Sequence, residues 1–157
     1  MKKLFLLLVA GLCSITTFAN PYLTGNKKLD RNLINIDHEA RRDKDKYVKK
    51  LKKNFDIKEE QYEELHLERE WSPGDIYLAL SIAKVKKVNI DIVQRQFQLH
   101  RTKGWSAILK ALEIKDSTPA YDKIQSTVKK GTPKRDYEEE RLNIYEKHKQ
   151  ELKQDKK

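Results

Sequence analysis

Cysteine is almost absent from this sequence: Cys13 is the only one among 157 residues, and it lies in an N-terminal segment that we expect to be cleaved off. Disulfide bonds and thiolate metal sites therefore cannot hold the mature chain together, and its stability must come from packing. Long apolar runs are also missing. The two runs of note, residues 4–13 and 76–83, are shorter than the ~20 residues that a membrane-spanning helix needs, so we expect no transmembrane segment in the mature chain.

The N-terminus has the layout of a secretory signal peptide. Lys2 and Lys3 precede the apolar run, and the small residue Ala19 follows it after a short polar stretch. This order of basic, apolar and small-residue regions is typical of a signal that is cleaved, here after Ala19. We therefore expect an exported protein, either periplasmic or secreted. An uncleaved membrane anchor is the alternative, and lipidation of Cys13 is disfavoured because the bulky Leu12 precedes it.

Charge is abundant and mostly basic. The 34 basic and 24 acidic residues give a net charge of +10, and charged residues make up 37% of the chain. An average soluble protein has about 25%, so we expect part of the chain to remain exposed. Residues 20–36 are polar and are interrupted by Pro21, Gly25 and Asn26, which predicts a flexible leader. Residues 37–54 are predicted to form a basic amphipathic helix.

That helix has two different faces. Tyr47 and Leu51 lie four residues apart on the apolar face. The other face carries a basic stripe, which is the candidate contact for an anionic partner: Arg42, Lys46, Lys49, Lys50 and Lys53. Such a stripe can meet a protein, an acidic polysaccharide or an anionic membrane surface. An ordinary solvated helix face is the alternative, because Asp43 and Asp45 lie beside the stripe.

Residues 55–130 are predicted to form a compact helical domain with an internal repeat. A shift of 32 residues aligns the pattern I-x-x-A-L-x-I at Ile76 with a second copy at Ile108, and each copy follows a helical pattern ending in L-x-R. We interpret the copies as two helix-turn-helix hairpins, residues 57–86 and 89–115. Chance similarity between two amphipathic segments is the alternative. The predicted core is Leu65, Leu67, Ile76, Ala79, Leu80, Ile82, Phe97, Leu99, Trp105, Ile108, Ala111, Leu112 and Ile114.

The clearest helix start lies at the sequence Ser72-Pro73-Gly74-Asp75. It combines a hydroxyl at the N-cap, proline at the first helical position and a carboxylate at the third, where it favours the exposed N–H groups. A helix should therefore begin there. The apolar run 76–83 that follows predicts that this helix is buried and central to the domain.

Further signals place the later helices. Trp105 follows the flexible Gly104 and is expected to begin a helix and to fill the junction of the two hairpins. Thr118 and the proline after it predict another helix start, and Gly131 predicts its end. Residues 131–157 are predicted to form a charged, solvated C-terminal helix.

The segment from residue 55 to residue 114 resembles a set of small bacterial secreted proteins, mostly without a known activity. Their pattern is G-D-[IL]-x-x-A-L-x-x-A-K, then a variable helix, then G-W-x-x-I-A-x-x-L-G. The positions that match it here are Gly74, Asp75, Ala79, Leu80, Ala83, Lys84, Gly104, Trp105, Ile108 and Leu112. Glu113 stands where the pattern has its final glycine. The resemblance implies a periplasmic helical domain and provides no catalytic residues to transfer.

Motifs of common enzyme classes are missing. The sequence has no G-x-S-x-G, no H-E-x-x-H and no phosphate-binding loop. Its histidines, His38, His66, His100 and His148, are scattered. Only Glu63-x-x-His66 has the spacing of a di-iron helix, and that site needs two such motifs. We therefore predict no catalytic residue, no metal and no cofactor.

A nucleic-acid partner is disfavoured as well. Residues 100–115 look like the opening of a DNA-reading helix-turn-helix, but the connection after them is longer than the turn of that motif. The helix that would read bases begins with Pro119, Ala120 and Tyr121, which are poor partners for base edges. The net charge alone supports only nonspecific phosphate binding.

Together these features predict an all-α protein: a compact bundle of short helices built from two helix-turn-helix hairpins, with flanking charged helices. We expect a monomeric, exported, non-enzymatic binding or scaffold protein of the bacterial envelope. Its partner would be another protein or an anionic envelope component. An accessory subunit, or an enzyme with an unrecognised site, is the alternative, and a nucleic-acid-binding helix-turn-helix protein is the least favoured.

Overall fold

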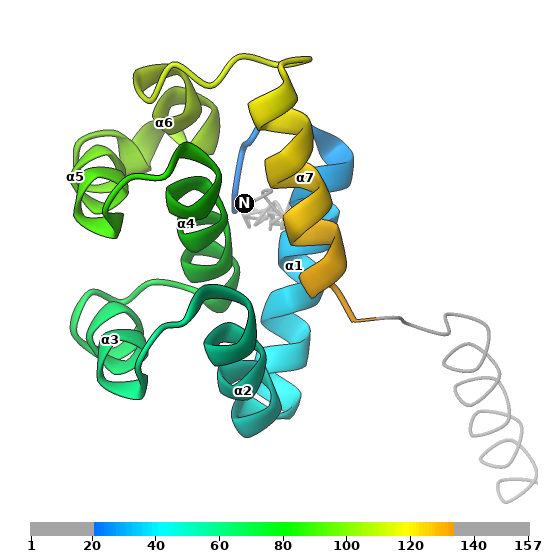
Figure 1. The fold of residues 1–157 in the computed structure, drawn as a ribbon, viewed down its shortest axis with the longest axis vertical. Coiled ribbons are helices and arrows are strands. Elements are labelled where there is room, and N and C mark those ends of the chain that lie inside the picture. The colour runs from blue at the N-terminus through cyan, green and yellow to red at the C-terminus, as the bar shows by residue number, and fades with distance from the viewer. Residues whose placement is uncertain (1–20, 134–157) are drawn as a thin grey trace, which may run out of the picture.

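The computed structural model describes residues 21–133, and these residues form helices and no β-strand (Figure 1). The predicted all-α fold class is therefore confirmed. The predicted signal peptide, and the predicted C-terminal helix from residue 134 onward, lie outside the described residues. The elements in chain order are α1 (Lys27–Arg42), α2 (Lys44–Phe55), α3 (Glu59–Glu63), the π-helical turn η1 (Glu64–Glu68), α4 (Pro73–Lys86), α5 (Ile90–His100), the 3₁₀ turn η2 (Arg101–Lys103), α6 (Trp105–Ala111) and α7 (Pro119–Gly131).

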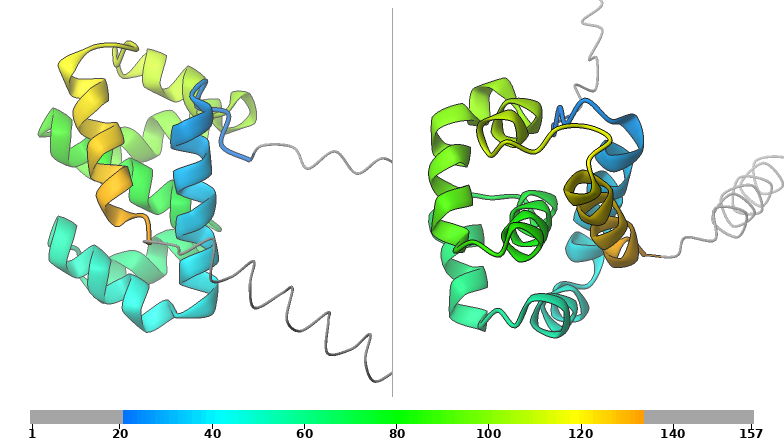
Figure 2. Two further views of the ribbon diagram at one scale, coloured as in Figure 1. Left: turned by 90° about the vertical axis from the view of Figure 1, so that its right-hand side faces the viewer. Right: turned by 45° about the horizontal axis from the view of Figure 1, so that its top comes forward.

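Helix α4 lies at the centre of the bundle, as its apolar sequence predicts. Every residue from Ile76 to Ala83 is buried. Figures 1 and 2 show α1 and α7 on one side of α4, and α3 and α5 on the other. The predicted cap is present: the Asp75 N–H donates to the Ser72 Oγ at 3.1 Å, and the Ser72 N–H donates to the Asp75 carboxylate at 3.3 Å. The helix therefore begins where the cap places it.

Helix α1 overturns the predicted flexible leader over residues 20–36, because residues 27–36 are helical. The Asn26 side chain accepts hydrogen bonds from two of the first N–H groups of this helix. Leu29, Leu33 and Ile36 then fall on one face, and all three are fully buried in the core. The turn-forming residues at the start of this stretch therefore cap a helix and do not mark a flexible segment.

The predicted single helix over residues 37–54 is also wrong, because the chain breaks at Asp43. The Asp43 side chain accepts a hydrogen bond from the Lys46 N–H at 3.0 Å and so caps α2, while its own N–H closes α1. Tyr47, Val48 and Leu51 on α2 are buried in the same core cluster as the residues of α4. The compact domain therefore includes α1 and α2 and does not begin at residue 55.

Both predicted hairpins are present. The first consists of α3 and η1 followed by α4, and the second consists of α5 and η2 followed by α6. Nine of the predicted core residues are buried: Leu65, Ile76, Ala79, Leu80, Ile82, Phe97, Trp105, Ile108 and Ile114. Leu112 is partly buried and packs against the core.

Three predicted core residues are exposed, and two of them share one cause. Leu67 is 63% exposed and Leu99 is 66% exposed. Each follows a buried residue by two positions, Leu65 and Phe97 respectively, and two residues along a helix rotate a side chain to the opposite face. The third, Ala111, is the last residue of α6 and faces solvent.

Trp105 fills the junction of the hairpins, as expected. It is buried, and its ring lies 5.2 Å from that of Phe97, which in turn lies 4.1 Å from the ring of Trp71 on the first hairpin. The Trp105 indole N–H donates to the Asp75 Oδ1 at 2.7 Å. This aromatic stack and its hydrogen bond join the second hairpin to the start of α4.

Candidate functional site

The predicted basic stripe maps onto the end of α1 and the length of α2. Arg42, Lys46, Lys49 and Lys53 are exposed there, as the stripe requires. Lys50 is different, because its side chain is only 22% exposed and points into the bundle. The helical spacing in the sequence therefore places Lys50 on the wrong face of α2.

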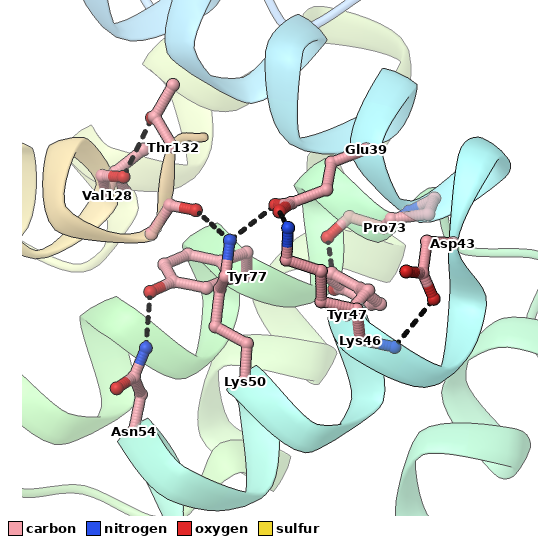
Figure 3. A network of polar contacts seen from close by, with 11 residues as sticks. Glu39, Asp43, Lys46, Tyr47, Lys50, Asn54, Pro73, Tyr77, Val128 and Thr132 are labelled. Carbon is pink, nitrogen blue, oxygen red and sulfur yellow. Dashed lines mark hydrogen bonds and ion pairs between the residues drawn. The ribbon is translucent and has the colours of Figure 1, made fainter. Parts of the chain in front are cut away.

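Lys50 connects three helices (Figure 3). Its Nζ forms an ion pair with Glu39 on α1, whose side chain is only 1% exposed. The same Nζ donates to the backbone carbonyl of Gly131, the last residue of α7, at 2.9 Å. A carboxylate buried to this degree needs a cation, and a cation beside the carbonyls at a helix C-terminus is favourable as well. Lys50 is therefore a structural residue.

This contact brings a second basic segment to the stripe. Because the Lys50 Nζ donates to the Gly131 carbonyl, the C-terminal end of α7 lies beside the Lys50 side chain, and the last turn of α7 carries the exposed Lys129 and Lys130. Neither was predicted to belong to the site, since the sequence separates them from α2 by more than 70 residues. We use the name basic surface for Lys46, Lys49, Lys53, Lys129 and Lys130.

The cations of this surface are mostly uncompensated. Within residues 21–133, Lys49, Lys53, Lys129 and Lys130 form no ion pair, and Lys46 lies 3.7 Å from the Glu39 Oε1. Two acidic neighbours of these lysines have other partners: Asp43 caps α2, and Glu39 is paired with Lys50. Asp45 remains exposed beside the stripe.

Lys52, on the same helix, contributes no free charge. It forms an ion pair with the Glu59 carboxylate at 2.7 Å, and this hydrogen bond lowers the pKa of Glu59. Both groups are well exposed, so the pair adds little to stability.

A second polar cluster surrounds the N-terminus of α4. The Tyr22 hydroxyl donates to Asp37 and lies 3.0 Å from the Ser72 Oγ, while the Gly74 N–H donates to Asp37 at 2.8 Å. Burial, and then the neighbouring carboxylate of Asp37, raise the pKa of Tyr22 far above its usual range. Burial also raises the pKa of Asp75, and hydrogen bonds from Trp105 and Ser72 act against this rise.

The hydrogen bonds of this cluster hold the N-terminal segment at the start of α4. Its side chains do not pair a nucleophile with a base. Beside it lies a shallow pocket of about 310 Å³, lined in part by Asp37, His66 and Ser72. The Ser72 hydroxyl is engaged by Asp75 at 2.8 Å, and the His66 Nδ1 faces the Trp71 carbonyl at 2.9 Å. Serine and histidine are therefore not arranged as nucleophile and base.

A groove of about 560 Å³ lies between the two hairpins. Its apolar lining comes from the end of α2, the α2–α3 connection, η1, α4, the α4–α5 connection and the start of α5: Phe55, Ile57, Leu65, Leu80, Ala83, Val88 and Ile90. Lys53, Asn54 and Lys84 line it as well. The groove thus shares Lys53 with the basic surface.

The part of the chain that the structure describes contains neither a metal site nor a membrane-spanning helix. No group of three or more histidine, cysteine or acidic side chains is placed there to hold a metal ion. No helix there is long and apolar enough to cross a membrane. Comparisons with family models, with curated protein sequences and with solved structures give no match to this chain.

Proposed function

We propose that this protein is an exported, non-enzymatic helical module that binds an anionic component of the bacterial envelope through its basic surface. The observation that carries the proposal is a set of exposed lysines from two helices that make no ion pair with any described residue: Lys49, Lys53, Lys129 and Lys130. Uncompensated cations gathered on one surface attract anions. The signal-like layout of residues 2–19 supports export.

Charge alone drives this binding. The large apolar side chains that are exposed in residues 21–133 are Leu23, Leu67, Ile92 and Leu99, and none lies on α2 or at the end of α7. Each lysine beside an anionic lipid surface contributes about 1 kcal/mol. Four lysines therefore give about 4 kcal/mol, which corresponds to millimolar affinity and fast, reversible adsorption.

Such binding must weaken as salt is added. The screening length is about 10 Å at 0.1 M ionic strength and about 3 Å at 1 M, so the attraction between exposed charges is lost over this range. An anionic vesicle is the simplest probe. We would measure sedimentation of the protein with vesicles of phosphatidylglycerol and phosphatidylcholine, and with phosphatidylcholine alone, across a salt series.

Two variants of equal charge test the location of the binding surface. In the first, the four unpaired lysines of the basic surface become glutamine, while Lys50 is retained because it holds the fold. In the second, four exposed lysines elsewhere become glutamine: Lys103, Lys110, Lys115 and Lys123. The first variant should lose most of its binding to anionic vesicles, and the second should keep most of it. Equal losses would show that net charge acts without a defined surface, and no binding of the native protein at low salt would refute the proposal for lipids.

A further inference from the structure

Helix α6 begins without a cap of its own. Gly104 occupies its N-cap position and has no side chain that could accept a hydrogen bond from the first turn. The Trp105 and Ser106 N–H groups donate instead to the backbone carbonyls of residues 22 and 23, at 2.8 and 2.9 Å. A helix of seven residues is too short to be stable by itself, so the start of α6 depends on this N-terminal segment. We use the name strap for residues 21–24.

The strap is anchored on two further helices. The Tyr22 side chain is buried, and its hydroxyl donates to Asp37 on α1 and lies 3.0 Å from the Oγ of Ser72, the N-cap residue of α4. Thr24 is buried as well, and its N–H and hydroxyl both donate to the Asp30 Oδ1 on α1, at 3.1 and 2.6 Å. Two carboxylates of α1 therefore hold the strap, while the carbonyls of the strap hold the start of α6.

Two glycines make room for the strap. A Cβ added at Gly74 would lie 2.0 Å from the Tyr22 hydroxyl oxygen, and one added at Gly104 would lie 2.5 Å from the Leu23 Cβ. Gly74 lies in the first turn of α4 and Gly104 directly precedes α6, so each glycine stands at the start of the second helix of one hairpin. The strap is therefore in close contact with both helix starts at the same time.

We propose that the strap is a conformational lock, whose contacts with α1, α4 and α6 form and break together. Its release removes the cap of α6 while the centre of α4 stays folded. Leu23 is half exposed, and its φ of 49° is a left-handed conformation that is unfavourable for leucine, so the strap keeps its shape only while its anchors hold. Because Thr24 lines a depression of about 870 Å³ together with Ser106 and Leu109 of α6, release of the strap opens that depression on one side. The proposal does not depend on the proposed function.

Hydrogen exchange of the backbone amides in the full chain tests this lock. The reporters are the Trp105 and Ser106 amides, whose hydrogen bonds end on the strap. In the native protein they should be at least about 10-fold less protected than the amide of the buried Leu78 at the centre of α4, which opens only when the whole protein unfolds. Tyr22→Phe and Thr24→Val each remove one hydroxyl anchor and leave α6 untouched. Each should raise the exchange of both reporters by about 10-fold or more, the effect of losing a hydrogen bond to a carboxylate.

The matched control is Tyr62→Phe, which removes the hydroxyl of another buried tyrosine. Tyr62 lies on α3, which provides none of the anchors of the strap, so both reporters should exchange as in the native protein. Unchanged reporter exchange in either strap variant would show that the anchors act independently, and would overturn the proposal. So would native reporters that are as well protected as the centre of α4, because the strap would then open only with the whole protein.

Discussion

Replacing Trp105 by phenylalanine should destabilise the protein to an extent that depends on pH. The indole of Trp105 is buried and donates its N–H to the Asp75 Oδ1 at 2.7 Å. Phenylalanine keeps most of the ring packing against Phe97 but has no donor. The Asp75 carboxylate then stays buried with the hydrogen bonds of Ser72 alone.

The size of the loss has two parts. A hydrogen bond to a charged group contributes about 1.5–3 kcal/mol to stability. The smaller ring costs about 1 kcal/mol in packing, and this part does not depend on pH. At neutral pH the free energy of unfolding should therefore fall by about 2.5–4 kcal/mol, and the melting temperature by roughly 10 °C or more.

The sign of the pH dependence follows from the pKa of Asp75. Burial raises this pKa in the folded state above its unfolded value of 3.8, and the Trp105 hydrogen bond lowers it again. Without that hydrogen bond the pKa of Asp75 in the folded state rises further. The variant therefore loses additional stability as the pH rises above the unfolded pKa toward this higher folded pKa. Below the unfolded value the carboxyl is protonated in both states, and mainly the packing loss remains.

Urea unfolding followed by circular dichroism, at about pH 3 and about pH 7, measures both parts. The matched control is Trp71→Phe, which removes a second buried indole from the same aromatic stack, where the Trp71 ring contacts Phe97 and its N–H donates to no carboxylate in residues 21–133. Its loss should be the same at both pH values. A Trp105→Phe loss that is equally independent of pH would refute the assigned role of the hydrogen bond.

Two further predictions concern the contact between α2 and α7. Lys50→Met should lower the free energy of unfolding by about 2–4 kcal/mol, because it leaves the Glu39 carboxylate buried without its nearest cation, whereas Lys49→Met should change it by less than about 0.5 kcal/mol. Equal effects in urea unfolding would show that Lys50 is an ordinary surface residue. Gly131→Ala should cost about 1–3 kcal/mol, because the added Cβ would lie 2.1 Å from the Tyr77 Cζ, and an unchanged melting temperature would contradict this packing.

Local signals in the sequence were sufficient for much of the fold. The start of α4 follows from the hydroxyl, proline and carboxylate at residues 72–75, and its central position follows from the apolar run after them. Trp105 could be placed because Gly104 before it allows a turn and the apolar residues after it have helical spacing. These features depend on neighbours within one or two turns of the chain, which the sequence displays directly.

The errors came from features that only packing decides. The turn-forming residues before Lys27 predict flexibility, although Leu29, Leu33 and Ile36 already have the spacing of one helix face. The recurrence of Leu67 and Leu99 in both repeats predicts core positions, yet recurrence says nothing about which face of its helix a residue occupies. A helical wheel drawn from the buried residue two positions earlier would have placed both on the outside.

The division of the basic stripe shows why spacing could not define the candidate site. Lys46, Lys49, Lys50 and Lys53 have the same charge and similar helical spacing, and only the distant Glu39 and Gly131 give Lys50 a different role. Because Lys50 points inward, the surface has one exposed cation fewer than the stripe predicts. Because Lys50 also holds the end of α7, Lys129 and Lys130 belong to the surface. A comparison of Lys50→Met with neutralisation of the exposed lysines therefore separates fold from binding: the first change should act on stability, and the second on attraction to anions.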